Sequence, residues 1–239
     1  MYLYIIRHGH PIYGPQEMLT HTGHKQARAL SERMIQSGIT KIYSSPLRRA
    51  RETAAPTARA LGLPVNIENW TSESLAWSRF TKDTPSGGKT WVWNSSDPGE
   101  FTRNNGNGGG DEWYKIDPMQ ACPTAKEGYD ALMAESDEFM ARQGYVRDGN
   151  EYKIVKPSEE RIAVFCHHGF GVTWLSHLLR IPPTIFWTHF DITHSGVTVL
   201  YFANRECGRT IPQCLCFSDM SHLWNNGGCD YLYHSYLKI

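Results

Sequence analysis

The stretch that decides the fold is residues 1–11, MYLYIIRHGHP. It begins with a short apolar run rich in aromatic and β-branched side chains, and Gly9 and Pro11 end that run, which predicts a buried β-strand. Arg7 and His8 then lie at the carboxyl end of the strand, the edge where ligands bind in open α/β sheets. The glycine lets a ligand approach the backbone closely. This stretch therefore predicts a buried strand with an arginine and a histidine at its carboxyl end, and the rest of the chain must decide whether they form a site.

Strand and helix patterns alternate along most of the chain. Further strands are predicted over 41–44, 65–67, 161–166 and 195–202, and helices over 20–38, 45–61, 124–140 and 172–179. Thr20 or Thr22 caps the first helix, and Ser45 caps the second with Pro46 at its first position. Such alternation is typical of a parallel sheet with helices on both faces. We therefore predict a single domain, residues 1–239, built as a three-layer α/β/α sandwich with a mostly parallel central sheet.

Residues from about 70 to 125 interrupt this alternation. They are rich in glycine, and their tryptophans include Trp77, Trp91, Trp93 and Trp113. Long irregular segments inside a compact domain are often lids or binding loops. The tryptophans indicate that part of the segment packs against other residues. We predict a loop-rich lid insertion here, whose tryptophans form an apolar wall over the ligand.

Composition and charge exclude several classes of protein. Lys+Arg 24 balances Asp+Glu 24, so the basic excess typical of nucleic-acid binders is missing. No apolar run approaches the roughly 18 residues that a membrane span needs, and Arg7 comes too early for a signal peptide. We expect a cytoplasmic protein that binds neither nucleic acid nor membrane, with its six cysteines reduced. Cys214 and Cys216 lack a second pair at zinc-site spacing, so no metal is expected there.

Two of the predicted strands are followed by similar short motifs that contain His-Gly. Arg7-His8-Gly9 follows the first strand, and His167-His168-Gly169 follows the strand that ends at residue 166. Neighbouring parallel strands would bring these ends together, and the helix that begins near Pro46 adds Arg49 close to another strand end. Arginine presents a planar set of donors that matches phosphate oxygens, and helix N-termini attract anions. The combination of two histidines, two arginines and a helix N-terminus predicts a phosphate site.

Four motifs, in order along the chain, carry a resemblance to a known family. They are Arg7-His8-Gly9, Leu19-Thr20-x-x-Gly23-x-x-Gln26-Ala27, Ser44-Ser45-Pro46-Leu47-x-Arg49-Ala50 and His168-Gly169. In this order they resemble the histidine phosphatase superfamily, the phosphoglycerate mutase-like group. The resemblance covers roughly the first 70 residues and residues 160–202, and it leaves the insertion unmatched.

The resemblance implies catalysis through a phosphohistidine. His8 would attack phosphorus as a neutral imidazole, and His168 would act beside it. Arg7, Arg49 and His168 would bind the oxygens on which charge is spread in the transition state. An acid must protonate the leaving oxygen, and Glu73 matches the family's acid best by position. The rival acids are Glu68, Glu100, Asp111 and Glu112.

The sequence therefore predicts a phosphomonoester hydrolase that acts on a small phosphorylated substrate through His8. No cofactor and no metal are expected, and oligomer formation is left open. A mutase must hold a second phosphate, which calls for a further cluster of basic residues. The insertion offers no such cluster, because its basic residues are scattered among acids. The polar residues that the family carries after Arg-His-Gly are replaced over residues 10–14, with Tyr13 or Gln16 as candidates for their role. Both observations count against the alternative, phosphoglycerate mutase-type phosphoryl transfer.

Two further hypotheses remain open. One is a metallohydrolase with four histidine ligands, His8, His10, His167 and His168. The neighbouring arginines count against it because they repel a cation. The other is a non-catalytic module that binds a phosphorylated ligand on the same scaffold, and the presence of His8, Arg49 and His168 counts against that.

Overall fold

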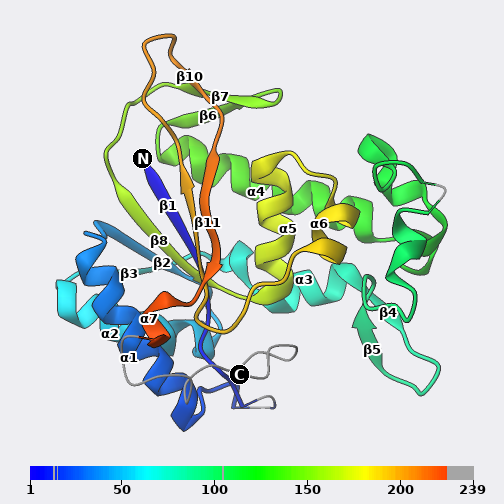
Figure 1. Cartoon of the computed structure of the whole chain (residues 1–239), viewed down its shortest axis with the longest axis horizontal. Helices are drawn as coiled ribbons and strands as arrows, with labels where there is room; N and C mark the ends of the chain where they lie inside the picture. Colours follow the sequence, from blue (N-terminus) through cyan, green and yellow to red (C-terminus); the bar gives the residue numbers. More distant parts are fainter. Residues whose placement is uncertain (13, 15, 104, 225–239) are drawn as a thin grey trace.

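A six-stranded sheet forms the centre of the molecule, in the order β11-β9-β1-β8-β2-β3 (Figure 1). The computed structural model describes residues 1–12, 14, 16–103 and 105–224. The strands are β1 (Tyr2–Arg7), β2 (Lys41–Ser44), β3 (Val65–Ile67), β8 (Arg161–Cys166), β9 (Val197–Tyr201) and β11 (Gln213–Asp219). β1 pairs with β8, β8 with β2 and β2 with β3 in parallel, whereas β9 pairs antiparallel with both β1 and β11, so that β9 alone opposes the direction of the other five strands of this sheet. The predicted mostly parallel sheet is confirmed.

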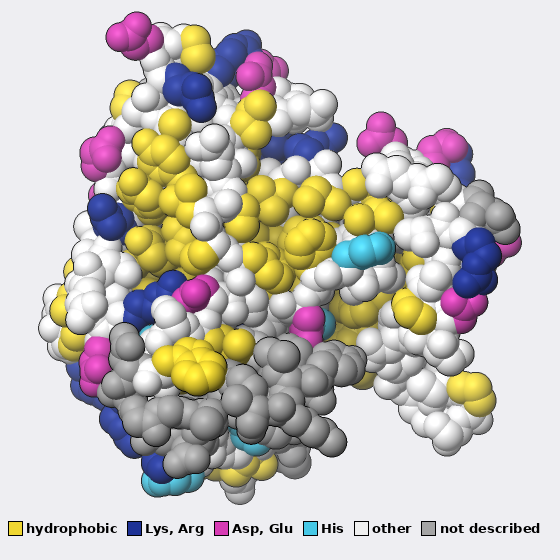
Figure 2. All heavy atoms as spheres, in the orientation of Figure 1, with side chains coloured by type: hydrophobic (Ala, Val, Ile, Leu, Met, Phe, Trp, Pro, Cys, Tyr) yellow, Lys and Arg dark blue, Asp and Glu magenta, His cyan; other side chains and the backbone are white. Residues whose placement is uncertain are grey.

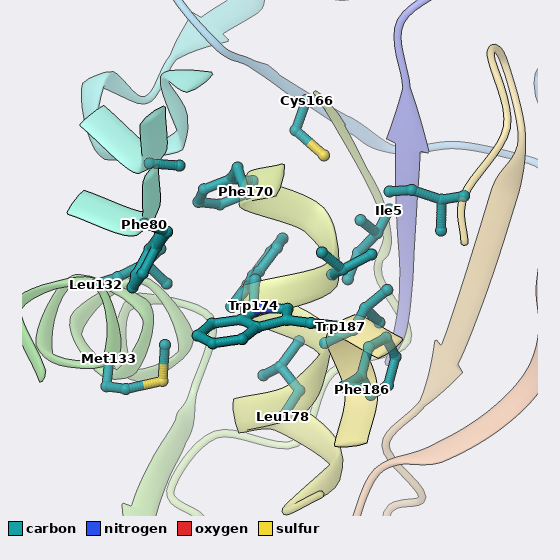
Figure 3. Close-up of a cluster of buried hydrophobic side chains, with 14 of the residues drawn as sticks. Ile5, Phe80, Leu132, Met133, Cys166, Phe170, Trp174, Leu178, Phe186 and Trp187 are labelled. Atoms are coloured by element: carbon teal, nitrogen blue, oxygen red, sulfur yellow. The ribbon is translucent and has the colours of Figure 1, made fainter. Parts of the chain in front are cut away.

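Helices cover both faces of this sheet. α1 (His21–Gln36) and α2 (Arg48–Leu61) lie on one side, and α4 (Ala125–Arg142), α5 (His168–Leu179) and α6 (Pro183–His189) lie on the other (Figure 1). The side chains of β1 alternate accordingly: Ile6 belongs to the apolar cluster under α1 and α2, and Ile5 belongs to the cluster under α5. Figure 3 shows this second cluster, with Trp174 beside Phe170. The predicted α/β/α sandwich is confirmed.

The segment predicted as a lid insertion contains short elements separated by turns. It begins with η1 (Asn69–Thr71) and α3 (Glu73–Phe80), continues through a hairpin of β4 (Thr81–Asp83) and β5 (Lys89–Trp91), and ends with η2 (Pro98–Phe101), η3 (Gly110–Lys115) and η4 (Asp117–Ala121). Its tryptophans pack as expected, since Trp93 and Trp113 are buried against Trp187 of α6. The loop-rich character is therefore confirmed, while the role of a lid stays a prediction.

Several boundaries differ from the prediction. α2 begins at Arg48 rather than at Pro46, and its N-cap Leu47 makes no side-chain cap. α5 begins at His168, four residues before the predicted start, and β9 begins at Val197. The sequence patterns also missed α3, α6, the hairpin of β6 (Tyr145–Asp148) and β7 (Glu151–Ile154), β10 (Arg209–Thr210), β11 and α7 (Ser221–Trp224). Within the described ranges no helix has both the length and the apolar character to cross a membrane.

Candidate functional site

A cavity of about 730 Å³ opens at the carboxyl end of the parallel strands. Its wall includes all five residues predicted for the site: Arg7, His8, Arg49, Glu73 and His168. They come from the ends of β1 and β8 and from the starts of α2 and α3, which the parallel sheet brings to one edge. Figure 2 shows the surface hollowed beside the part that carries the β4–β5 hairpin. The sheet therefore gathers residues that are up to 161 positions apart in the sequence.

His8 is held as a buried neutral imidazole. Its Nδ1 lies 2.7 Å from the carbonyl oxygen of Gly9, and its Nε2 lies 3.2 Å from Nε of Arg49. A guanidinium can only donate, so Nε2 must be the acceptor and Nδ1 carries the proton. Burial above all, and then the nearby His167, Arg7 and Arg49, hold the pKa of His8 well below its usual range. The ring thus keeps an unprotonated nitrogen on the side of Arg49.

Two guanidinium groups line the cavity together with the His8 ring. Arg7 donates to the carbonyl oxygen of Ile192 at 2.6 Å and contacts Nε2 of His194 at 2.9 Å. Arg49 is buried, and its Nη1 lies 3.3 Å from a carboxylate oxygen of Glu17. Glu17 has a positive φ of 47° and lines the same cavity. An anion that binds both arginines would therefore compete with the Glu17 carboxylate.

His168, the first residue of α5, is oriented by a carboxylate that the sequence did not indicate. Its Nε2 lies 2.7 Å from Oδ1 of Asp191, which also lines the cavity. An ionised carboxylate can only accept, so Nε2–H donates to it. Nδ1 is then the nitrogen that remains outside this hydrogen bond. Asp191 lies in the irregular segment between α6 and β9, where no motif or periodicity singles it out.

Glu73 binds the N-terminus of the same helix. One carboxylate oxygen accepts from the backbone N–H of Gly169 at 2.9 Å, and the other accepts from that of Phe170 at 2.8 Å. These amides lie in the first turn of α5, where backbone donors lack partners within the helix. Each oxygen keeps a second lone pair, so the carboxylate can still meet a ligand. Glu73 is therefore fixed at the cavity wall next to His168.

The rival acids do not line this cavity. Glu68 is buried and accepts from Nε1 of Trp70 at 2.8 Å and from Arg142 at 2.9 Å. Glu100, Asp111 and Glu112 lie in η2 and η3, further along the insertion. Glu17 and Asp191, which sequence reasoning missed, are the acids that join Glu73 there. Gln16 is exposed and does not line the cavity, while Tyr13 lies outside the described residues.

The remaining histidines near His8 are held by protein groups. His167 is fully buried, with Nε2 2.7 Å from Oγ of Ser45 and its ring centroid 5.1 Å from that of His8. His10 pairs through Nδ1 with Oγ1 of Thr20 at 3.0 Å. Among the residues that the structure describes, no three His, Cys, Asp or Glu side chains are grouped as metal ligands. The four histidines of the metallohydrolase hypothesis are thus not arranged as a ligand set.

Comparison with known proteins supports this assignment of motifs. The model of the histidine phosphatase superfamily (branch 1) matches residues 3–92. A curated relative, the probable phosphoglycerate mutase GpmB of Photorhabdus laumondii, is 30% identical over 112 residues, which are 36% of this chain and 52% of the relative. The chain therefore spans about half the length of this relative.

Solved structures resemble the whole described fold. The phosphoserine phosphatase of Entamoeba histolytica in complex with 3-phosphoglyceric acid superposes with a TM-score of 0.57 at 22% identity, covering 93% of this chain and 98% of that one. A mycobacterial glucosyl-3-phosphoglycerate phosphatase in complex with VO3 superposes with a TM-score of 0.56 at 16% identity, covering 91% and 98%. At such identities these likenesses establish the fold.

Proposed function

We propose that this chain, whose residues 3–92 match the model of the histidine phosphatase superfamily, is a metal-independent phosphomonoester hydrolase that acts on a small molecule through a phosphohistidine at His8. The observation that carries this proposal is the state of His8: a buried neutral ring whose unprotonated Nε2 accepts from Nε of Arg49, with Arg7 on the same cavity wall and near enough for its charge to lower the pKa of the ring. A neutral imidazole is nucleophilic, and fixed cations beside it stabilise the charge of a transferring phosphoryl group.

In the first step, Nε2 of His8 attacks phosphorus, and the bond from phosphorus to the ester oxygen breaks. Arg49 exchanges its hydrogen bond to Nε2 for one to a phosphoryl oxygen, which releases the lone pair for attack. Arg7 and His168 bind the other oxygens. Glu73, protonated on one oxygen, donates that proton to the leaving alcohol. The products of this step are the free alcohol and phosphorylated His8.

In the second step, water attacks the phosphoryl group and the bond from nitrogen to phosphorus breaks. Glu73, now a carboxylate, accepts a proton from the water, so the acid of the first step is the base of the second. Inorganic phosphate leaves, and His8 returns to its neutral state. Asp191 is a positioning residue in this scheme, since it orients the ring of His168.

The insertion has a role in the same proposal. Trp77 of α3 and Trp91 of β5 line the cavity, with ring centroids 4.8 Å apart. Residues 70–125 would then be a lid within one domain, 1–239, that encloses the leaving group. Enclosure excludes bulk water and strengthens the contacts of the phosphoryl group with the arginines. A cytoplasmic location belongs to this proposal as well.

The experiment is mass spectrometry of the protein after brief turnover of p-nitrophenyl phosphate, with an alkaline quench because phosphohistidine is labile in acid. The wild type should carry a phosphoryl adduct on His8, with or without EDTA. His8→Ala should lose both the adduct and turnover, while His24→Ala, a change on α1 outside the cavity, should keep both. Activity that EDTA abolishes, or an adduct on another residue, would contradict the mechanism. A folded protein with neither adduct nor turnover would favour a binding module.

Mutase activity is the runner-up, favoured by the name of the curated relative. A mutase returns the phosphoryl group from His8 to a second hydroxyl of the substrate instead of to water. The measurement is the ratio of released phosphate to interconverted 2- and 3-phosphoglycerate. We expect phosphate release to dominate, and a ratio in favour of interconversion would support the mutase.

A further inference from the structure

The half of the cavity that would receive the leaving group differs in chemistry from the phosphate half. Its wall consists of Trp77, Trp91, Thr90, Asn94 and Ser74. The arginines of the cavity wall, Arg7 and Arg49, come instead from β1 and α2, and Arg49 donates to His8. We propose that this half is a subsite for an uncharged ring with a flat apolar face, so that the preferred substrates are monophosphates of ring compounds without a second anionic group. This inference rests on the proposed phosphatase function and specifies its substrate class.

The first argument is the position of Trp91. A Cβ atom on Gly169 would lie 2.3 Å from Cη2 of Trp91, so the edge of the indole occupies the space that a side chain there would need. The same Gly169 donates its N–H to Glu73, the proposed acid. The leaving oxygen must come within hydrogen-bond distance of that acid. The group attached to this oxygen would therefore lie against the indole of Trp91.

The second argument is the rigidity of the aromatic wall. Trp91 stacks on the buried Trp93 at 4.8 Å with an interplanar angle of 8°, and Trp93 stacks on the buried Trp187 at 4.7 Å. Trp77 meets Trp91 edge to face, at 81°. It lies one helical turn after Glu73, on the same face of α3. A wall supported from behind in this way keeps its shape when a ring packs on it, which lowers the entropic cost of binding.

The third argument is charge. Beyond the phosphate site the described wall of the cavity offers hydroxyl and amide groups, and its acids are Glu17, Glu73 and Asp191. A carboxylate or second phosphate on the leaving group would find no cationic side chain in this part of the wall and would be repelled by the acids. Nδ2 of Asn94 donates to Oγ1 of Thr90 at 3.0 Å, so its Oδ1 is left as an acceptor for a hydroxyl. Neutral aryl groups and sugar rings both fit this description.

The test compares kcat/KM for four monophosphates that all release a primary alcohol, which keeps their intrinsic reactivity similar. Benzyl phosphate carries an aryl ring and glucose 6-phosphate a sugar ring. Ethyl phosphate has no ring, and O-phosphoserine has charged groups, including a carboxylate, besides its phosphate. At least one ring ester should exceed ethyl phosphate by about tenfold or more, the factor expected from packing one ring on an aromatic wall. O-Phosphoserine should be the poorest substrate. The ring ester with the higher kcat/KM shows whether the subsite prefers an aryl ring or a sugar ring.

Variants on α3 test whether the aromatic wall causes the preference for ring esters. Trp77→Ala should reduce the ratio of kcat/KM for the preferred ring ester to that for ethyl phosphate by about tenfold. Leu75→Ala, on the same helix with a similar exposure of 39% against 38% for Trp77, should leave that ratio unchanged. Phosphoserine turnover equal to or above that of the ring esters would overturn this inference and leave the phosphatase intact. Hydrolysis of p-nitrophenyl phosphate but of none of the four esters would overturn this inference alone. Hydrolysis of none of the five would overturn the proposed function and this inference with it.

Discussion

Acid should destabilise this protein through a histidine behind the site, His222 of α7. Its Nε2 lies 3.0 Å from Oγ of Ser195, and the backbone N–H of Ser195 donates to the carbonyl oxygen of His8 at 3.1 Å. Burial first, and then the positive charge of Arg33, lower the pKa of His222 to about 4, against an opposing effect of Asp219. A lowered pKa in the folded state means that the unfolded chain binds more protons below about pH 6.5.

The sign and the size of the change in the free energy of unfolding follow from this difference between the folded and unfolded pKa of His222. The stability contributed by neutral His222 is fully present above pH 6.5 and is lost as the pH falls towards the folded pKa of about 4. Between about pH 7.5 and pH 5.5 the loss for this one group is about 1.3 kcal/mol in the free energy of unfolding. His222→Asn removes the titration, so the free energy of unfolding of the variant should fall by about 1.3 kcal/mol less than that of the wild type over this range.

The assay is urea unfolding followed by tryptophan fluorescence at the two pH values, with the free energy extrapolated to water. Only the difference in pH dependence is compared, so a constant cost of losing the hydrogen bond to Ser195 does not disturb the result. The same substitution at the exposed His21, on α1, is the control and should keep the wild-type pH dependence. An equal pH dependence in His222→Asn and wild type would refute the reasoning.

Three more substitutions test the site. Glu73→Gln should lower kcat/KM, which reports the first step, by about 10²–10⁴-fold for ethyl phosphate and much less for p-nitrophenyl phosphate, whose leaving group needs no proton. Equal losses of kcat/KM would exclude Glu73 as the acid. Asp191→Asn weakens a charged hydrogen bond to His168, so kcat should fall about 10- to 100-fold with little change in Tm; an unchanged kcat would remove its positioning role. Gly169→Ala forces a Cβ against Trp91 and should lower the free energy of unfolding by about 1–3 kcal/mol in urea, and wild-type stability would show that the indole moves freely.

Local sequence patterns predicted five of the six strands of the central sheet and five residues of the cavity wall. The apolar runs before Arg7 and His168 predict two parallel strands, and parallel neighbours must end at the same edge, so the two motifs meet without any knowledge of the loops. The hairpin of β6 and β7 was missed although its two-residue turn, Gly149-Asn150, is a typical hairpin signal. Asp191 and Glu17 had no such signal, because irregular segments bring them to the cavity.

The misplaced helix starts have a common physical reason. Ser45 has the sequence context of a cap, yet its hydroxyl lies 2.7 Å from Nε2 of the buried His167, and the helix begins later, at Arg48. α5 begins earlier than its sequence suggests because its first amides bind Glu73, 96 positions away from Gly169. Capping rules search within a few residues of the helix start. A cap supplied by a distant side chain is invisible to them.

The contact of Glu73 with the first turn of α5 also links the insertion structurally to the predicted phosphate site. Glu73 lies at the start of α3, near the beginning of the insertion, and its carboxylate binds the turn of α5 that carries His168. Trp91, from the same segment, packs on Gly169 in that turn. A displacement of the insertion would thus move the proposed acid, the aromatic wall and the first turn of α5 at once. Changes of substrate class by mutation of this segment should therefore alter kcat together with KM.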